Sequence, residues 1–179
     1  GARPQFIKAA ALSKEIQDSP KLREFIIHTG QHYDANMSQQ FFDQLKIPKP
    51  THVFKSNTFS SSSFIGESVT KIGMAITELK PDCLLVFGDT YSTLAGSVAA
   101  NAHGVPLAHV EAGLRSFNRN MPEEHNRVVT DHLSDFLFCP SEVATKNLLQ
   151  ENIGKNKTPI VRNVGDIMFD ALKLFAPLA

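Results

Sequence analysis

The sequence predicts an α/β fold with a mostly parallel sheet, and two features of the chain carry this prediction. Short apolar runs bounded by turn residues alternate with segments whose apolar residues recur at helical spacing, a pattern typical of βαβ units. Polar clusters directly follow three of the apolar runs, as expected where parallel strands end. With 179 residues, 42% of them hydrophobic, the chain can bury one core, so we expect a single domain over residues 1–179.

The apolar runs predict six strands. They cover residues 25–28, 52–54, 83–87, 105–110, 136–139 and 160–164, of which 52–54 is the weakest. A domain of this kind usually opens with a strand, whereas this chain begins with the loop that would follow one, so we expect the first strand of the fold to be absent from residues 1–179. Cys83 and Cys139 fall within apolar runs and lack metal-ligand spacing, so we expect two buried, reduced thiols.

Helical spacing predicts the segments between the strands. Apolar residues at spacings of 4, 3, 4 and 3 indicate a helix over residues 63–79, preceded by a polar loop. A second helix is expected over residues 37–45, with Asp34 as its N-cap. Residues 92–103 include no Asp, Glu, Lys or Arg, so we expect this helix to pack directly on the sheet. Pro122 marks the first turn of a further helix.

Charge and motif patterns exclude several classes of function. The 18 basic and 18 acidic residues give zero formal net charge without a basic stripe, so we expect no nucleic-acid or membrane partner. The sequence has no apolar run of about 18 residues and no signal-peptide pattern, which favours a cytoplasmic protein. The seven histidines lack HExxH spacing, and the GxSxG and GxxxxGK[ST] motifs are missing. We therefore expect no metal site, no serine nucleophile and no common ATPase loop.

Three polar clusters follow predicted strands. They are Thr-Gly-Gln-His at residues 29–32, Gly-Asp-Thr at 88–90 and Glu-Ala-Gly at 111–113. Because the carboxyl ends of parallel strands meet at one edge of a sheet, these clusters should face one crevice. The pattern predicts a small-molecule site, a nucleotide site among the possibilities, but it specifies no reaction.

The carboxylates in and beside these clusters each allow two interpretations. Asp89 precedes the uncharged helix, where it can cap the helix, transfer a proton, or do both. Glu111 ends an apolar strand, so it needs either a partner such as Arg115 or a functional role, and we favour function. Glu123 and Glu124 suit any helix start, and their position alone favours that interpretation.

Two cations lie near the start of the chain. Arg3 and Lys8 flank Pro4 at the beginning of a predicted helix. The free N–H groups of a helix N-terminus, with positive charge nearby, suit a phosphate. A solvated helix face explains Lys8 equally well.

Six motifs in series carry a resemblance to a known family. They are GARPQFIK at residues 1–8, HTGQH at 28–32, GDT at 88–90, HVEAGLR at 109–115, PEEHNR at 122–127 and VGD at 164–166. With these motifs the chain resembles the non-hydrolysing UDP-N-acetylglucosamine 2-epimerases, including those acting on modified sugars such as UDP-diacetamido-uronic acids. The resemblance implies a Rossmann-like three-layer domain, one half of a GT-B-type two-domain enzyme whose active site lies between its domains.

The resemblance also implies roles for individual residues. Asp89, Glu111 and Glu123 match the catalytic carboxylates of the family. The residues expected to bind the UDP-sugar are Arg3, Lys8, Gln31, His32, Arg115 and Arg127, the first two near its phosphates. In the family, residues of the Gln-His motif also contribute to a second, activating UDP-sugar site.

The implied reaction converts UDP-N-acetylglucosamine, or a modified UDP-sugar, into its C2 epimer without a cofactor. Loss of the C2 proton and departure of UDP give a 2-acetamidoglucal, to which UDP and a proton add back. The resemblance further implies a homodimer in the full-length form. It also implies no turnover without the second domain, which in the family supplies a catalytic His and the uridine contacts. Two alternatives remain: a glycosyltransferase of the same two-domain architecture, and a non-catalytic fragment that binds a sugar nucleotide.

Overall fold

A computed structural model describes residues 3–31, 45, 47–55, 60–156 and 158–176. The chain divides into two compact units. The unit called here the terminal unit joins residues 1–56 to residues 167–179, and the central unit comprises residues 57–166. Each unit has a parallel sheet of its own.

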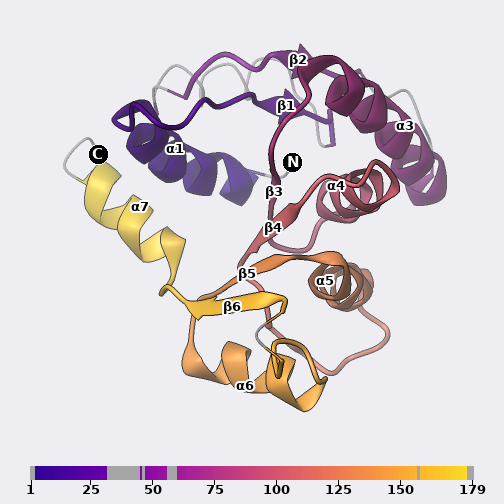
Figure 1. Cartoon of the computed structure of the whole chain (residues 1–179), viewed down its shortest axis with the longest axis vertical. Coiled ribbons are helices and arrows are strands. Elements are labelled where there is room, and N and C mark those ends of the chain that lie inside the picture. The colour runs from indigo at the N-terminus through magenta and orange to yellow at the C-terminus, as the bar shows by residue number, and fades with distance from the viewer. Residues whose placement is uncertain (1–2, 32–44, 46, 56–59, 157, 177–179) are drawn as a thin grey trace. The chain divides into compact units, whose positions relative to one another are not determined.

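The central unit is a four-stranded parallel sheet with helices between its strands (Figure 1). In chain order its elements are α3 (Ser61–Leu79), β3 (Leu84–Phe87), α4 (Tyr91–Ala102), β4 (Leu107–Val110), α5 (Pro122–Leu133), β5 (Phe136–Cys139), α6 (Glu142–Gln150) and β6 (Ile160–Asn163). The strands lie in the order β3-β4-β5-β6, so each βαβ step moves one strand along the sheet. The predicted α/β fold with parallel strands is confirmed.

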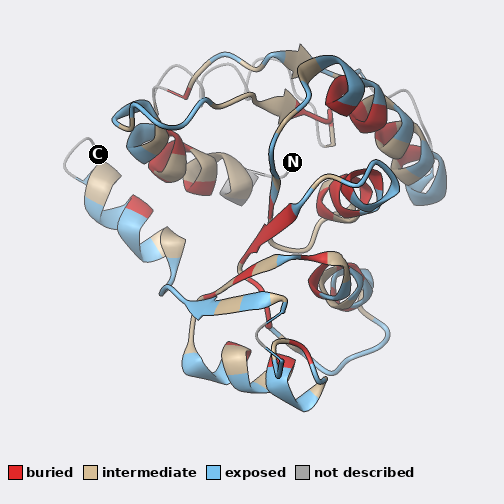
Figure 2. Cartoon of the chain, in the orientation of Figure 1, coloured by how far each residue is buried: buried red, intermediate tan, exposed pale blue. Residues whose placement is uncertain are grey.

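Strand β4 lies inside this sheet and is buried at all four positions, and Figure 2 shows it as one of the most continuously buried segments. Helix α4 packs against α3, α5 and β3. Its buried residues are Thr93, Ala95, Gly96, Ser97, Ala99 and Ala100. The prediction that the uncharged segment packs against the sheet is confirmed.

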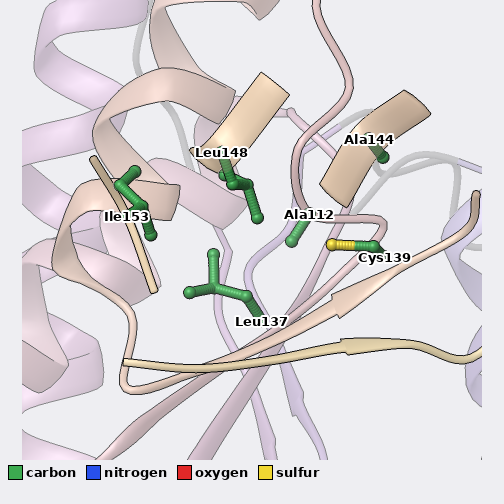
Figure 3. Packing of buried hydrophobic residues seen from close by; sticks show 6 residues of the cluster. All are labelled: Ala112, Leu137, Cys139, Ala144, Leu148 and Ile153. Atoms are coloured by element: carbon green, nitrogen blue, oxygen red, sulfur yellow. The ribbon is translucent and has the colours of Figure 1, made fainter. Parts of the chain in front are cut away.

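A hydrophobic cluster connects α6 with the sheet (Figure 3). It consists of Ala112, Leu137, Cys139, Ala144, Leu148 and Ile153. Cys139 is buried as predicted, and burial raises the pKa of its thiol. Cys83 is a free thiol as predicted, but its predicted burial is wrong, because this residue precedes β3 and is exposed.

The terminal unit contains α1 (Arg3–Gln17), β1 (Ile27–His28), β2 (His52–Val53) and α7 (Ile167–Phe175). Strands β1 and β2 pair in parallel, and α1 packs on α7. Ala10 and Ile47 form its buried centre, surrounded by the partly buried Phe6, Ile26, Leu45 and Phe175. Of the helix expected over residues 37–45, residues 37–44 lie outside the described part of the chain, as does its expected cap Asp34.

Element bounds differ modestly from the sequence predictions. Several strands are shorter than predicted, whereas β5 has the predicted bounds. Helix α3 begins two residues earlier, because Ser60 caps it by accepting a hydrogen bond from the backbone N–H of Ser63 at 3.2 Å. Helices α6 and α7 were not predicted. Across the described residues, no helix combines the length and the apolar character needed to cross a membrane.

Candidate active site

Two turns at the carboxyl edge of the central sheet carry polar side chains. Residues 88–90 follow β3, and residues 111–113 follow β4. The two strands pair in parallel with Phe87 opposite Val110, and the N–H of Gly88 donates to the carbonyl of Val110 at 3.0 Å. The prediction that these two clusters share one edge of the sheet is therefore confirmed. The third cluster, at residues 29–32, belongs to the terminal unit.

Glu111 adopts a left-handed backbone conformation with φ of 71°. A residue other than glycine in this region costs about 1–3 kcal/mol and persists only where its surroundings hold it. Here the N–H groups of Glu111 and Ala112 both donate to the carbonyl of Phe138 in β5, at 3.0 and 3.1 Å. The backbone of Glu111 is therefore strained and held in place directly after β4, and its side chain is half-buried.

Asp89 is held by two residues of α5. Arg127 donates from Nη2 to its Oδ2, and Asn126 donates from Nδ2 to its backbone carbonyl at 2.8 Å. Thr90, and not Asp89, is the N-cap of α4, because its Oγ1 accepts from the N–H of Thr93. The interpretation of Asp89 as the cap of α4 is therefore wrong, and its carboxylate pairs with a cation instead.

The two adjacent glutamates of α5 have different environments. Glu124 is only 5% exposed, and its carboxylate accepts from the N–H and Oγ of Ser116, both at 2.9 Å, and from the N–H of Phe117 at 2.8 Å. Burial alone would raise the pKa of Glu124, but these hydrogen bonds and Arg127 lower it below its usual value. Glu123 is exposed in the same first turn. Glu124 therefore fixes the loop before α5, and Glu123 faces outward.

The structure places Arg115 away from a ligand-binding role. Its side chain is 1% exposed, and Nη1 donates to Asp131 at 2.7 Å while Nε and Nη2 donate to Glu151 at 2.7 Å. A guanidinium buried between two carboxylates has its donors engaged within the fold. The expectation that Arg115 contacts the substrate is therefore corrected. Arg115 was also suggested as a partner of Glu111, but it pairs with Asp131 and Glu151 instead.

The remaining predicted binding residues belong to the terminal unit. Arg3 is the first residue of α1, and Lys8 is a buried residue of the same helix. Gln31 follows β1 by three residues, and His32 lies outside the described residues. Within the described part of the chain, no group of three or more His, Cys, Asp or Glu side chains could hold a metal ion.

Sequence reasoning named Glu124 and Arg127 of α5 but missed Asp131, which lies on the same face. Glu124, Arg127 and Asp131 recur at spacings of three and four, so they lie on one face of the helix. Glu124 and Asp131 are buried, and Arg127 is mostly so. The available signal was a row of polar residues at helical spacing between two apolar strands. A helix in that place turns one face to the sheet, so polar residues repeated on one face can indicate buried polar contacts.

Comparison with known proteins shows which proteins this chain resembles. The family model for UDP-N-acetylglucosamine 2-epimerase matches residues 14–179. The UDP-2,3-diacetamido-2,3-dideoxy-D-glucuronate 2-epimerase of Pseudomonas aeruginosa is 51% identical over 179 residues, which are 100% of this chain and 50% of that protein. A UDP-N-acetylglucosamine 2-epimerase homolog of Methanococcus maripaludis is 51% identical over 96% of this chain and 46% of its own length. The chain thus spans about half the length of the curated relatives it matches.

Solved structures agree with the sequence comparison. The crystal structure of Methanocaldococcus jannaschii UDP-GlcNAc 2-epimerase in complex with UDP-GlcNAc and UDP has a TM-score of 0.92 and 40% identity, covering 98% of this chain and 48% of that one. The Neisseria meningitidis enzyme bound to UDP-GlcNAc has a TM-score of 0.90 and 33% identity, covering 99% of this chain and 48% of its own. The predicted Rossmann-like fold is therefore confirmed.

Proposed function

Because the chain belongs to the UDP-N-acetylglucosamine 2-epimerase family, we propose that it carries the catalytic carboxylates of an enzyme that inverts C2 of a UDP-N-acetylhexosamine. The substrate is UDP-N-acetylglucosamine or a derivative modified on the sugar. Residues 1–179 contribute one half of the active site. The relatives are about twice as long as this chain. Turnover needs the second half that they contain.

One observation carries this proposal. Asp89 and Glu111 leave neighbouring parallel strands at the same edge of the sheet, and Glu111 is held in a strained backbone conformation. Strain of this kind concentrates at functional sites, where the fold maintains a geometry that the backbone would not otherwise adopt. Arg127 and Asn126 of α5 hold Asp89 by hydrogen bonds to its carboxylate and its backbone carbonyl.

The chemistry requires more than one proton-transfer group. One group removes the C2 proton while the bond between C1 and the UDP oxygen breaks, which gives a 2-acetamidoglucal and UDP. UDP then adds back to C1 as a proton reaches C2 from the opposite face. General acid and base catalysis of this kind contributes about 10²–10⁴ in rate. Asp89, Glu111 and the exposed Glu123 are the groups proposed for these transfers.

The reaction is balanced without an external oxidant or reductant, since UDP leaves and returns and the proton is exchanged. The proposal therefore includes no cofactor. Stabilising the departing diphosphate needs cations and helix N-termini, so Arg3 and Lys8 are proposed to lie near it. Gln31, His32 and Arg127 are proposed to contact other parts of the UDP-sugar. We also propose a cytoplasmic homodimer, which sedimentation of the full-length enzyme and cell fractionation would test.

A chimera tests the proposed function. Residues 1–179 replace the matching first half of the Pseudomonas aeruginosa relative, and proton NMR in D₂O follows the C2 hydrogen of UDP-N-acetylglucosamine and of UDP-2,3-diacetamido-2,3-dideoxy-D-glucuronate. We expect deuterium at C2 and the C2 epimer with at least one substrate. The Glu111→Gln chimera should bind UDP but exchange at most about one hundredth as fast.

The same experiment distinguishes the alternatives. A folded chimera that binds UDP but exchanges neither substrate would contradict the catalytic role and leave sugar-nucleotide binding as the function. Release of UDP only after an acceptor sugar is added would indicate a glycosyltransferase. The Glu111→Gln control separates exchange by this chain from exchange by a contaminating enzyme.

A further inference from the structure

We propose that His109 of β4 and Asp131 of α5 are positioning residues for the reaction. This inference deepens the proposed function and rests on it. The two residues contact the turns that contain Asp89 and Glu111. They affect the proton transfers only by holding those turns in place.

The side chains of His109 and Asp131 form a hydrogen-bonded pair in the interior of the central unit. Nδ1 of His109 lies 2.7 Å from Oδ1 of Asp131, and both side chains are 0% exposed. Burying such groups is costly unless each finds a hydrogen-bond partner. Their remaining polar atoms are satisfied by backbone groups of the two turns and by Arg115.

The second ring nitrogen of His109 holds the first turn. Nε2 donates to the carbonyl oxygen of Gly88 at 2.7 Å, and this carbonyl belongs to the peptide group that precedes Asp89. Gly88 has a φ of 61°, so the turn is sharp at this point. The two ring nitrogens of His109 thus lie against oxygen atoms of Asp131 and of Gly88.

The second oxygen of Asp131 holds the other turn. Oδ2 accepts from the N–H of Gly113 at 3.0 Å, two residues beyond Glu111. It also accepts from Nη1 of Arg115 at 2.7 Å. Gly113 has a φ of 78°, so this turn too depends on a left-handed backbone. One buried carboxylate therefore holds the turn after β4 directly, and it holds the turn after β3 through His109.

Positioning of this kind matters because proton transfer is sensitive to small displacements. A misplacement of about 1 Å can cost about a hundredfold in rate. In metal sites, residues that orient the metal ligands are worth about 10–100-fold in affinity or activity, and we expect an effect of similar size here. Loss of the pair should therefore lower kcat by this amount while leaving the KM for the UDP-sugar within about threefold.

The chain contains a matched control for burial alone. Thr130, next to Asp131 on α5, accepts a buried hydrogen bond from Oγ of Ser97 at 3.2 Å. Both residues are 0% exposed, and this bond joins α5 to α4 without involving either turn. Thr130→Val thus removes a buried hydrogen bond of the same helix and should lower stability alone.

Hydrogen exchange followed by mass spectrometry on the 179-residue chain tests positioning without any activity. In His109→Leu and Asp131→Asn, peptides covering residues 86–91 and 111–117 should exchange at least about tenfold faster, whereas Thr130→Val should leave both within about twofold. Asp131→Asn keeps the shape of the side chain, so the test stands if His109→Leu does not fold. Unchanged exchange in both turns of a folded variant would overturn the proposal.

Kinetics of the epimerase chimera test the consequence for the reaction. His109→Leu should lower kcat about a hundredfold. His109→Gln can still donate to the Gly88 carbonyl, so it should recover part of this loss, and Thr130→Val should stay within about twofold. Equal kcat losses in His109→Leu, His109→Gln and Thr130→Val would overturn the positioning role. An inactive unsubstituted chimera would instead contradict the proposed function, and the exchange result would still decide whether the pair holds the turns.

Discussion

Arg127 on α5 donates to the carboxylate of Asp89, which lies 38 residues earlier in the turn after β3. The neighbouring Asn126 donates to the backbone carbonyl of the same aspartate at 2.8 Å. Helix α5 therefore fixes both the side chain and the main chain of Asp89, which lies in the turn after β3.

Arg127→Gln should affect activity far more than stability. Arg127 is 13% exposed and Asp89 30% exposed, and exposed ion pairs contribute about 0–1 kcal/mol, so we expect a stability loss near the upper end of this range. Loss of the residue that orients Asp89 should slow C2 exchange by the chimera about 10–100-fold. Urea unfolding and NMR measure the two effects. Lys71→Gln, which breaks a partly exposed pair with Glu67 on α3, should change neither by a measurable amount.

Glu111→Gly should abolish C2 exchange without lowering the free energy of unfolding. Glycine adopts a left-handed backbone without the cost of about 1 kcal/mol or more that Glu111 bears. Lys80→Gly is the matched control, because Lys80 has a φ of 48° at the end of α3 and lies in neither turn. It should be at least as stable as the parent and fully active. A clear loss of stability in Glu111→Gly alone would show that Glu111 has a structural role.

Glu124→Gln should flatten the dependence of stability on pH under acidic conditions. Burial opposes ionisation of Glu124, but hydrogen bonds from Ser116 and Phe117 lower its pKa below 4.5. A lowered carboxyl pKa stabilises the fold above the unfolded pKa, and that contribution is lost as pH falls through the folded value. Urea unfolding from pH 6 to pH 3 measures it. The exposed Glu142→Gln should keep the steeper dependence of the parent.

Gly113→Ala should destabilise the chain more than Gly104→Ala. Both glycines have a positive φ, +78° and +64°. A Cβ at position 113 would overlap the carbonyl oxygen of Ala144 and lie 2.8 Å from its carbon, whereas at position 104 it meets nothing within 4 Å. Backbone strain alone should cost about 1 kcal/mol at Gly104, and the overlap should add about 1–3 kcal/mol at Gly113. Equal losses in thermal unfolding would contradict the close contact with α6.

His28 should titrate well below an ordinary histidine. Burial lowers the pKa of His28 from 6.5 to about 4, and its Nδ1 accepts from the N–H of Gly30 at 3.1 Å. The unfolded chain then binds more protons between these pH values, so stability should fall as pH is lowered from 6.5 to 4. NMR titration of the His28 ring measures the midpoint directly. In His28→Asn, which keeps an acceptor for Gly30, this fall in stability should disappear.

The order of helices and strands in the central unit was predictable because its signals are local. Residues 136–139 form a strand with the predicted bounds, and α5 begins at Pro122 as predicted. Helix α6 was missed although Ser141 caps it by accepting from the N–H of Ala144 at 3.2 Å. A cap and nine helical residues give a weaker periodic signal than the 19 residues of α3.

The sequence alone determined which edge of the sheet carries Asp89 and Glu111, because alternating strands and helices place the carboxyl ends of parallel strands together. Only the tertiary structure decided the partners of the polar side chains. Arg115 pairs with Asp131, 16 residues away, and with Glu151, 36 residues away. Such choices depend on which groups lose water together inside the folded unit, and no local spacing encodes that.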